Sequence, residues 1–310
     1  MKRLSILLTL VLAALLPAGS QPKPGPFAGR WDVTVTTPNS TYPGWLEVVE
    51  KGGSIQARVQ PREGSVHPVK ELKVTGTRLI LTLEPAEGTN PDMRWELSAA
   101  GEKLSGELKR GDKTAGQVTA VRAPELERTE PRAWTEPEPI FNGRDLTGWE
   151  PINAANSKWI ARDGVLVNQT SGSNLKSTRK FDDFQLHIEV NCPQGGNSGI
   201  YLRGRYEVQV EYESTLEDPL HEMGAIYGYI APQVRMPHTP GTWESFDVTL
   251  VGRTLTLYRN GVLLINRKEI AGITGGALDS REGELGPFYL QGDHYGEMKF
   301  RNITIRVPKQ

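Results

Sequence analysis

Hydrophobic and polar residues alternate along most of the chain with the two-residue period of strands that bury one face. Trp31, Val33 and Val35 alternate with Asp32 and Thr34 in the first such run. Further apolar runs from residue 45 to residue 121 are separated by turn residues such as Gly52-Gly53, Gly76-Thr77 and Gly111-Asp112. They predict about eight short strands over residues 27–123, which is typical of a small antiparallel β-barrel or sandwich.

The second half of the chain follows the same alternation. Residues 184–190, 206–212 and 246–250 each place apolar side chains at every second position. Asn260-Gly261 lies between two apolar runs and predicts a hairpin with a type I′ turn. No amphipathic pattern long enough for a helix of twelve residues is present in the sequence. We therefore predict an all-β chain in which the residues from Ile140 to the end form a two-sheet sandwich or jelly roll.

One segment falls outside these strand patterns. Residues 124–138 are rich in Pro and Glu and predict a stiff, solvated linker between the two β domains. At the start of the first domain, Gly29-Arg30-Trp31 resembles the opening of lipocalin-like barrels. We find no catalytic constellation in residues 27–123, so a structural or docking role is the simpler expectation for this domain.

The first twenty residues have the pattern of a secretory signal peptide. Lys2 and Arg3 precede an apolar run from Leu4 to Leu16, and small residues follow up to Ser20. The run is shorter than the ~20 residues that a membrane-spanning helix needs. We expect residues 1–20 to be removed on export, to a periplasmic or extracellular location, with no membrane span in the mature chain.

Charge and cysteine content exclude several classes of protein. The 310 residues contain 36 Lys and Arg against 37 Asp and Glu, a formal net charge of −1. This balance lacks the basic surplus of a nucleic-acid-binding protein. The single cysteine, Cys192, cannot form an internal disulfide or a cysteine-rich zinc or iron–sulfur site.

Polar side chains of an unusual kind alternate with the apolar set in the second domain. Gln185, His187 and Glu189 belong to one predicted strand, Tyr201 and Arg203 to the next, and Glu207, Gln209 and Glu211 to a third. An ordinary solvated face carries more Lys, Thr and Ser, whereas these groups are suited to binding sugar hydroxyls and to proton transfer. We expect the set to share one polar sheet face, with a plain outer surface as the alternative.

Two loops add candidate groups to this face. Asn197 lies in a Gly-rich stretch between predicted strands, where a simple turn is the alternative explanation. Gln291, Asp293 and His294 follow a predicted strand that ends at Leu290. Histidine can serve as acid or base near neutral pH, although a loop histidine is more often a surface residue.

The spacing of carboxylates argues against an ordinary retaining glycosidase. That mechanism needs two carboxyl groups about 5–5.5 Å apart. Glu207 and Glu211 are four residues apart on one predicted strand, which corresponds to ~13 Å. Glu189 on another strand could still complete a closer pair. The strand also departs from the E-x-D-x-x-E pattern of laminarinase-type sandwiches, because Gln209 stands between its two acids.

Six segments in order resemble one family. They are residues 140–149 (IFNGRDLTGW), 196–204 (GNSGIYLRG), 206–210 (YEVQV), 224–228 (GAIYG), 241–247 (GTWESFD) and 300–303 (FRNI). Together they resemble the 3-keto-disaccharide hydrolase domain, also described as 3-keto-glucoside 1,2-lyase and 3-keto-2-hydroxy-glucal hydratase. The resemblance covers residues 139–308 and implies a concanavalin A-like jelly roll, in agreement with the strand pattern.

The resemblance implies chemistry on sugars that are already oxidised at C3. The ketone acidifies the proton on C2, so a base can remove it, the glycosidic oxygen leaves C1 by β-elimination, and water adds to the glucal that forms. Such a reaction needs a base, a proton donor and a group that stabilises the enolate.

We assign roles to residues of this sequence as hypotheses. Glu207 or His294 is the base or acid, and Arg203 stabilises the enolate or holds a hydroxyl. Substrate hydroxyls are expected to bind Asn197, Gln209, Tyr227, Gln291 and Glu189. Glu211 and Asp293 are the candidate ligands of a divalent cation such as Ca²⁺; no other cofactor is expected.

Two other functions remain open on the sequence alone. Non-catalytic carbohydrate-binding modules share this architecture, and an ordinary laminarinase-like glycoside hydrolase would act on unoxidised glucans. All three readings predict an oligosaccharide or glycoside as the partner, and none fixes the oligomeric state. Only the first predicts conversion of a 3-keto-disaccharide to free products.

Overall fold

The computed structural model describes residues 25–51, 54–62, 64–83, 93–212 and 218–309 of the chain. Apart from one 3₁₀ turn at Ala154–Asn156, the regular elements of these residues are strands. The all-β prediction is therefore confirmed. No described helix is apolar and long enough to cross a bilayer. The predicted signal peptide, residues 1–20, lies outside the described residues.

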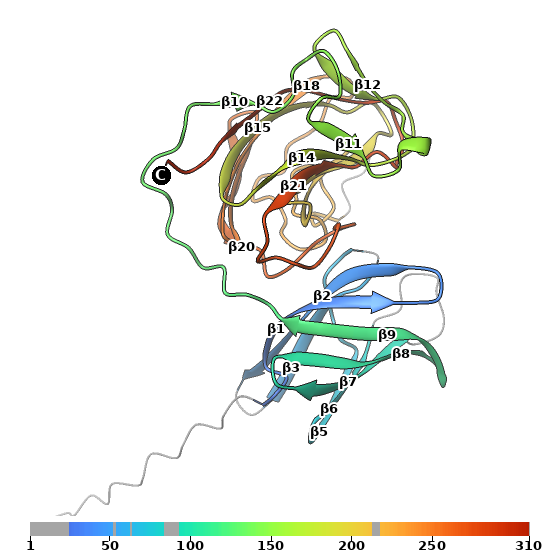
Figure 1. Cartoon of the computed structure of the whole chain (residues 1–310). Helices are drawn as coiled ribbons and strands as arrows, with labels where there is room; N and C mark the ends of the chain where they lie inside the picture. Colours follow the sequence, from blue (N-terminus) through green and yellow to red (C-terminus); the bar gives the residue numbers. More distant parts are fainter. Residues whose placement is uncertain (1–24, 52–53, 63, 84–92, 213–217, 310) are drawn as a thin grey trace, which may run out of the picture.

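The first nine strands form one strongly curled antiparallel sheet (Figure 1). They are β1 (Gly29–Thr36), β2 (Thr41–Lys51), β3 (Ser54–Gln60), β4 (His67–Pro68), β5 (Glu71–Thr75), β6 (Arg78–Thr82), β7 (Met93–Ala100), β8 (Lys103–Arg110) and β9 (Lys113–Arg122). The strand order is β4-β3-β2-β1-β9-β8-β7-β6-β5. Every strand that the alternation predicts is present, and the two-residue β4 is an addition to them. We call residues 25–122 the first β unit.

The alternation builds the core of this unit directly. Trp31, Val33 and Val35 are fully buried and pack with Leu46, Trp95 and other inward-facing side chains. Because successive side chains of a strand point to opposite faces, the intervening polar residues lie outside this core.

The described strands of residues 138–306, which we call the second unit, form two packed sheets. The eight-stranded sheet contains β10 (Glu138–Pro139), β12 (Trp159–Arg162), β13 (Val165–Asn168), β15 (Phe184–Asn191), β18 (Trp243–Val251), β19 (Thr254–Arg259), β20 (Val262–Glu269) and β22 (Met298–Arg306). The five-stranded sheet contains β11 (Trp149–Pro151), β14 (Leu175–Phe181), β16 (Asn197–Leu202), β17 (Tyr206–Glu211) and β21 (Gly286–Leu290). The apolar faces of both sheets contribute to one large core, as a β-sandwich requires.

The structure corrects the expectation that three polar rows share one face. β15, with Gln185, His187 and Glu189, belongs to the eight-stranded sheet, whereas β16 and β17 belong to the five-stranded sheet. Because the apolar sides of both sheets meet in the core, their polar sides point away from each other. Alternation shows which residues of a strand share a face, but it does not show which sheet the strand joins.

The Pro/Glu-rich segment predicted as a linker runs along the second unit (Figure 1). Leu126 is buried, Arg128 pairs with Asp182 and Asp183, and Glu130 pairs with Arg267. The segment has no regular structure of its own before β10, and most of its other residues are exposed or half-buried. The domain boundaries themselves stay a prediction.

The first β unit contacts the second unit through an apolar cluster and hydrogen bonds. Trp45 packs with Ala271, Ile273 and Ala277, and its indole nitrogen donates to the Ile273 carbonyl over 2.8 Å. At the edge of this contact, Arg30 forms an ion pair with Glu269. This contact places the end of β3 beside the polar face of the five-stranded sheet.

Candidate functional site

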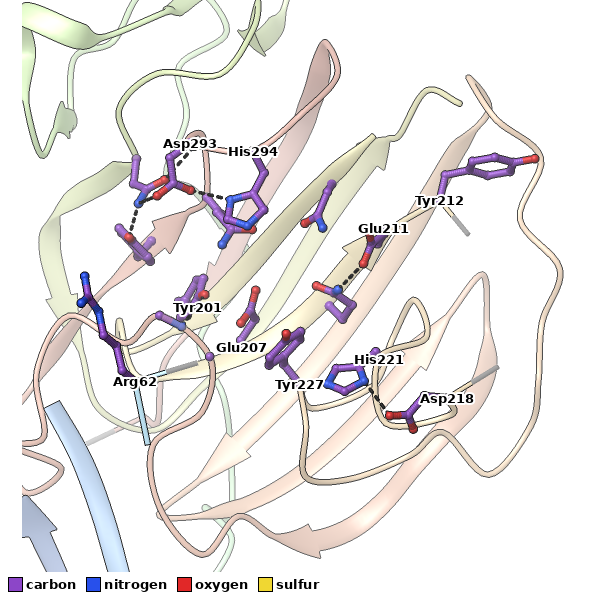
Figure 2. Close-up of a pocket in the computed structure, with 17 residues that line it drawn as sticks. Arg62, Tyr201, Glu207, Glu211, Tyr212, Asp218, His221, Tyr227, Asp293 and His294 are labelled. Atoms are coloured by element: carbon purple, nitrogen blue, oxygen red, sulfur yellow. Dashed lines mark hydrogen bonds and ion pairs between the residues drawn. The ribbon is translucent and has the colours of Figure 1, made fainter. Parts of the chain in front are cut away.

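A polar cavity of about 820 Å³ lies over the five-stranded sheet (Figure 2). Its walls come from the sheet, from the loops that surround it and from one residue of the first β unit. The lining residues are Arg62, Asn174, Asn197, Tyr201, Glu207, Gln209, Glu211, Tyr212, Asp218, His221, Tyr227, Gly275, Gly276, Tyr289, Gln291, Asp293 and His294.

Eight of the ten predicted site residues line this cavity. They are Glu207, His294, Asn197, Gln209, Tyr227, Gln291, Glu211 and Asp293. On β17 the alternation explains the result, because Tyr206, Val208 and Val210 enter the core and leave the intervening acids and amide on the opposite face. The loop residues reach the cavity because β21 lies beside β16, and the chain that leaves β21 continues over the same face.

Glu207 is the most enclosed carboxyl of the cavity, with 3% of its surface exposed. Its carboxyl lies against the backbones of Gly199 and Gly275. A Cβ built on Gly199 would lie 2.2 Å from Glu207 Oε1, and a Cβ built on Gly275 would lie 1.7 Å from Glu207 Oε2. Only residues without a side chain fit there. Burial raises the pKa of Glu207 to about 8, against the opposing influence of the Tyr201 hydroxyl and His294.

Two tyrosines stand beside Glu207 across neighbouring strands. Tyr201 pairs with Glu207 on β17 and with Tyr289 on β21, and the two rings meet edge to face at 4.7 Å. The Tyr201 hydroxyl accepts a hydrogen bond from the Gly276 amide over 2.9 Å. Burial raises the pKa of both tyrosines, so they stay neutral donors at physiological pH.

Asp293 and His294 form a hydrogen-bonded pair at the cavity rim (Figure 2). The His294 Nδ1 lies 2.8 Å from Asp293 Oδ1, and this bond raises the pKa of the imidazole. Burial works against ionisation of Asp293, yet hydrogen bonds from His294 and Asn174 lower its pKa. Asn174 also fixes the loop that follows β21, because its Oδ1 accepts hydrogen bonds from the backbone amides of Gly292 and Asp293.

Amide groups on the cavity floor offer acceptors to a ligand. Gln209 donates from Nε2 to Glu211 over 2.8 Å, which leaves its Oε1 buried and without a partner among the described residues. The Oε1 of Gln291 is also buried and without a partner among the described residues. A buried acceptor without a partner is costly, so hydroxyl groups of a bound sugar are suitable partners for both.

The wall opposite Asp293 comes from a loop between β17 and β18. His221 Nδ1 lies 2.7 Å from Asp218 Oδ2, and its ring lies 4.7 Å from that of Tyr227. Sequence reasoning did not select Asp218 or His221, because their spacing matches no ligand motif. It also missed Asn174, which precedes β14, and Tyr289, which lies within β21. The polar row through Tyr201 was the one available signal for the tyrosines.

Two predicted site residues lie elsewhere. Glu189 is on the eight-stranded sheet, where it accepts from Arg301 and Asn302 over 2.6 Å each. Arg203 follows the last residue of β16 in a left-handed conformation, φ 52°, and its guanidinium contacts Asp182, Tyr206 and the Gly252 carbonyl. The turn ends the strand alternation, so Arg203 points into buried structure and is absent from the lining of the cavity.

The divalent cation predicted for Glu211 and Asp293 stays a prediction. Glu211 and Asp293 both line the cavity, but among the described residues no three His, Cys, Asp or Glu side chains are grouped to hold a metal ion. Hydrogen bonds from Gln209, Asn174 and His294 already engage both carboxylates. We therefore derive no catalytic step through a cation.

Comparisons with known proteins single out the second unit. The 3-keto-alpha-glucoside-1,2-lyase-like domain family matches residues 136–306. A 3-keto-disaccharide hydrolase of Bacteroides thetaiotaomicron is 26% identical over 122 residues, or 34% of this chain and 42% of that protein. The match thus spans less than half of the relative.

Two crystal structures from Parabacteroides distasonis, both provisionally assigned as glycosyl hydrolases, are also similar. One is 28% identical, covers 58% of this chain and 93% of its own, and has a TM-score of 0.48. The other is 19% identical, covers 56% of this chain and 92% of its own, and has a TM-score of 0.46.

Proposed function

We propose that this chain, which belongs to the 3-keto-alpha-glucoside-1,2-lyase-like domain family, cleaves glycosides and disaccharides that carry a ketone at C3. The observation that carries the proposal is the polar cavity in which the buried carboxyl of Glu207 faces the Asp293–His294 pair. The related Bacteroides protein bears the name of such a hydrolase. Acid, base and hydroxyl-binding groups are all present on the cavity wall.

The first step is removal of the C2 proton. We assign the base to Glu207, because a carboxylate with a pKa near 8 is a much stronger base than an ordinary glutamate. The C–H electrons form the enolate, and its negative charge develops on the C3 oxygen. Arg203 does not line the cavity, so we assign enolate stabilisation to the Tyr289 hydroxyl, which accepts from Asn174 and has its own hydrogen to donate.

The second step breaks the C1–O bond. The enolate electrons form the C1–C2 double bond, and the leaving oxygen takes a proton. His294 is suited to supply it, because Asp293 orients the ring through Nδ1 and favours its protonated form. Addition of water then places a hydroxyl on C1 and a proton on C2, and the net change is hydrolysis.

The experiment compares 3-keto-trehalose with trehalose as substrates of the purified protein, with and without a chelator. We expect products from the oxidised sugar alone, in both the presence and the absence of chelator. Turnover of trehalose would instead favour an ordinary glycosidase. Binding of the oxidised sugar without turnover would favour a carbohydrate-binding module. Loss of activity with chelator would support the predicted cation.

We also propose that the protein acts after export. The support is the n-region and apolar run of residues 1–20. Mass spectrometry of the protein from its native host tests this, and a mature chain that begins near Gln21 is the expected result. A chain that retains Lys2 and Arg3 would contradict it.

A further inference from the structure

The first β unit reaches the cavity although it lies outside the family match, residues 136–306. Its contribution comes from the chain that follows β3. Arg62 lines the cavity, and Gln60, Gly64 and Ser65 contact the loops that form two of the cavity walls. These contacts join segments more than 150 residues apart in the sequence.

The backbone of Gly275 is held on both sides by Gln60 and Gly64. Its amide donates to the Gly64 carbonyl over 3.0 Å, and its carbonyl accepts from Gln60 Nε2 over 3.1 Å. The Gln60 side chain is buried, with 1% of its surface exposed. A buried amide donor is costly unless it is hydrogen-bonded, and the Gly275 carbonyl is the partner of Gln60 Nε2, whereas Gln60 Oε1 is buried without a partner among the described residues.

Gly275 in turn lies directly against Glu207. Gly275 has a φ of +59°, and a Cβ built on it would lie 1.7 Å from Glu207 Oε2. Bare backbone therefore covers the carboxyl. No side chain stands between them. The position of this one peptide therefore controls how closely the carboxyl is enclosed and how much water reaches it.

The same segment also holds the opposite wall. Ser65 Oγ lies 2.9 Å from His221 Nε2, and the Val66 amide donates to the Gly228 carbonyl over 3.0 Å. A Cβ on Gly228 would come within 2.5 Å of the Ser65 Cα. Both walls of the cavity thus depend on the docking of the first β unit.

We propose that the first β unit is part of the active site: Gln60 is a positioning residue that holds Gly275 over Glu207, and Arg62 contacts bound substrate. This deepens the proposed function, because it rests on Glu207 as the reacting carboxyl. Arg62 is exposed in the free protein, so its guanidinium is accessible to hydroxyl groups of the part of the glycoside nearest the first unit.

Replacing Gln60 by Met tests the positioning role, because methionine has a similar length but no donor. We expect the Gly275 amide to exchange with solvent at least tenfold faster, and kcat for 3-keto-trehalose to fall at least tenfold with a smaller change in KM. We also expect the titration midpoint of the Glu207 carboxyl to move to lower pH as water enters. Carbon NMR of labelled glutamate, assigned with Glu207→Gln, measures that midpoint.

The charged and titratable groups that interact with Glu207 are Tyr201, Tyr289, Glu211, Asp293 and His294, and none of them is changed in this variant. Glu269→Gln is the matched control: it removes the ion pair with Arg30 between the same two units without contact to Gly275. It should leave amide exchange, titration and kcat unchanged.

Unchanged titration and kcat in a folded Gln60→Met protein would overturn the positioning role. Should that variant fail to fold, Gln60→Asn keeps a polar amide that is one methylene too short to reach Gly275, and the same results are expected.

Arg62→Ala should raise KM at least tenfold with kcat retained; an unchanged KM removes Arg62 from the site. Failure of the proposed function appears differently, as a wild-type protein that does not turn over 3-keto-trehalose, while titration and exchange still report on Gln60.

Discussion

Among single residues, Glu207 is a nearly fully buried carboxyl whose pKa lies far above that of an ordinary glutamate. Its carboxyl is enclosed by glycine backbone and carries a pKa near 8, so it is protonated in most molecules at pH 7. A protonated, buried carboxyl stabilises the fold, whereas its ionised form is costly to bury. The same group therefore links catalysis to stability.

Glu207→Gln should remove most of the activity on a 3-keto-glycoside. General base catalysis by a positioned side chain contributes on the order of 10²- to 10⁴-fold, and the amide cannot accept the C2 proton. The isosteric change preserves packing, so circular dichroism should match the wild type. Undiminished turnover by the folded variant would reject Glu207 as the base.

The same variant should be more stable than the wild type at pH 8. The folded pKa of Glu207 lies above its usual 4.5, so the stability it contributes is complete below pH 4.5 and is lost as the pH rises to about 8. The difference is on the order of a few kcal/mol, because each pKa unit corresponds to about 1.4 kcal/mol. Chemical denaturation of both proteins at pH 5 and pH 8 measures it. An equal effect of pH on both would show that Glu207 titrates normally.

His294→Gln should lower kcat and leave the ring partner Asp293 in place. The imidazole is the proposed proton donor, so the loss should be largest for poor leaving groups and small for an activated aryl 3-keto-glucoside. Steady-state rates with the two kinds of substrate make the comparison. Equal losses with both would remove His294 from the step that breaks the C1–O bond.

At the scale of strands and loops, the site depends on where alternation ends. The alternation of polar and apolar residues correctly grouped Glu207, Gln209 and Glu211, because all three lie within β17. It failed for Arg203, since β16 ends at Leu202 and the next residue enters a turn. It also failed for Glu189, because a two-residue period carries no information about which of two sheets a strand joins.

Tyr289→Phe should reduce kcat more than it changes KM. The hydroxyl accepts from Asn174 and is the proposed donor to the C3 oxygen, where charge develops only as the enolate forms. Loss of one such donor costs on the order of 10²-fold. Steady-state kinetics of Tyr289→Phe beside a control at the exposed Tyr295 test this role. A raised KM with unchanged kcat would assign Tyr289 to substrate binding alone.

For the molecule as a whole, docking of the first β unit completes the cavity. Fold class and most strands could be predicted from local patterns, because alternation is a local property of the chain. The contacts of Trp45 with Ile273 and of Gln60 with Gly275 could not, since each joins residues more than 200 positions apart. A unit whose sequence shows no catalytic constellation therefore shapes a site in another sheet.

Trp45→Ala should weaken this docking. It removes a buried ring and the hydrogen bond to the Ile273 carbonyl, and such large-to-small changes cost about 3–5 kcal/mol. We expect faster amide exchange in residues 271–277 and loss of activity, with both β units still folded by circular dichroism. Unchanged exchange in that loop would show that Trp45 does not hold it.

The central claim is that cleavage begins with removal of the C2 proton by a group in this cavity. The most direct measurement is the kinetic isotope effect on kcat/KM with 3-keto-trehalose that carries deuterium at C2, run beside solvent-deuterium uptake into the product. Elimination through an enolate predicts a primary isotope effect and deuterium at C2 of the sugar released in heavy water. A product that keeps its original C2 hydrogen, formed at equal rates from both substrates, would contradict the account.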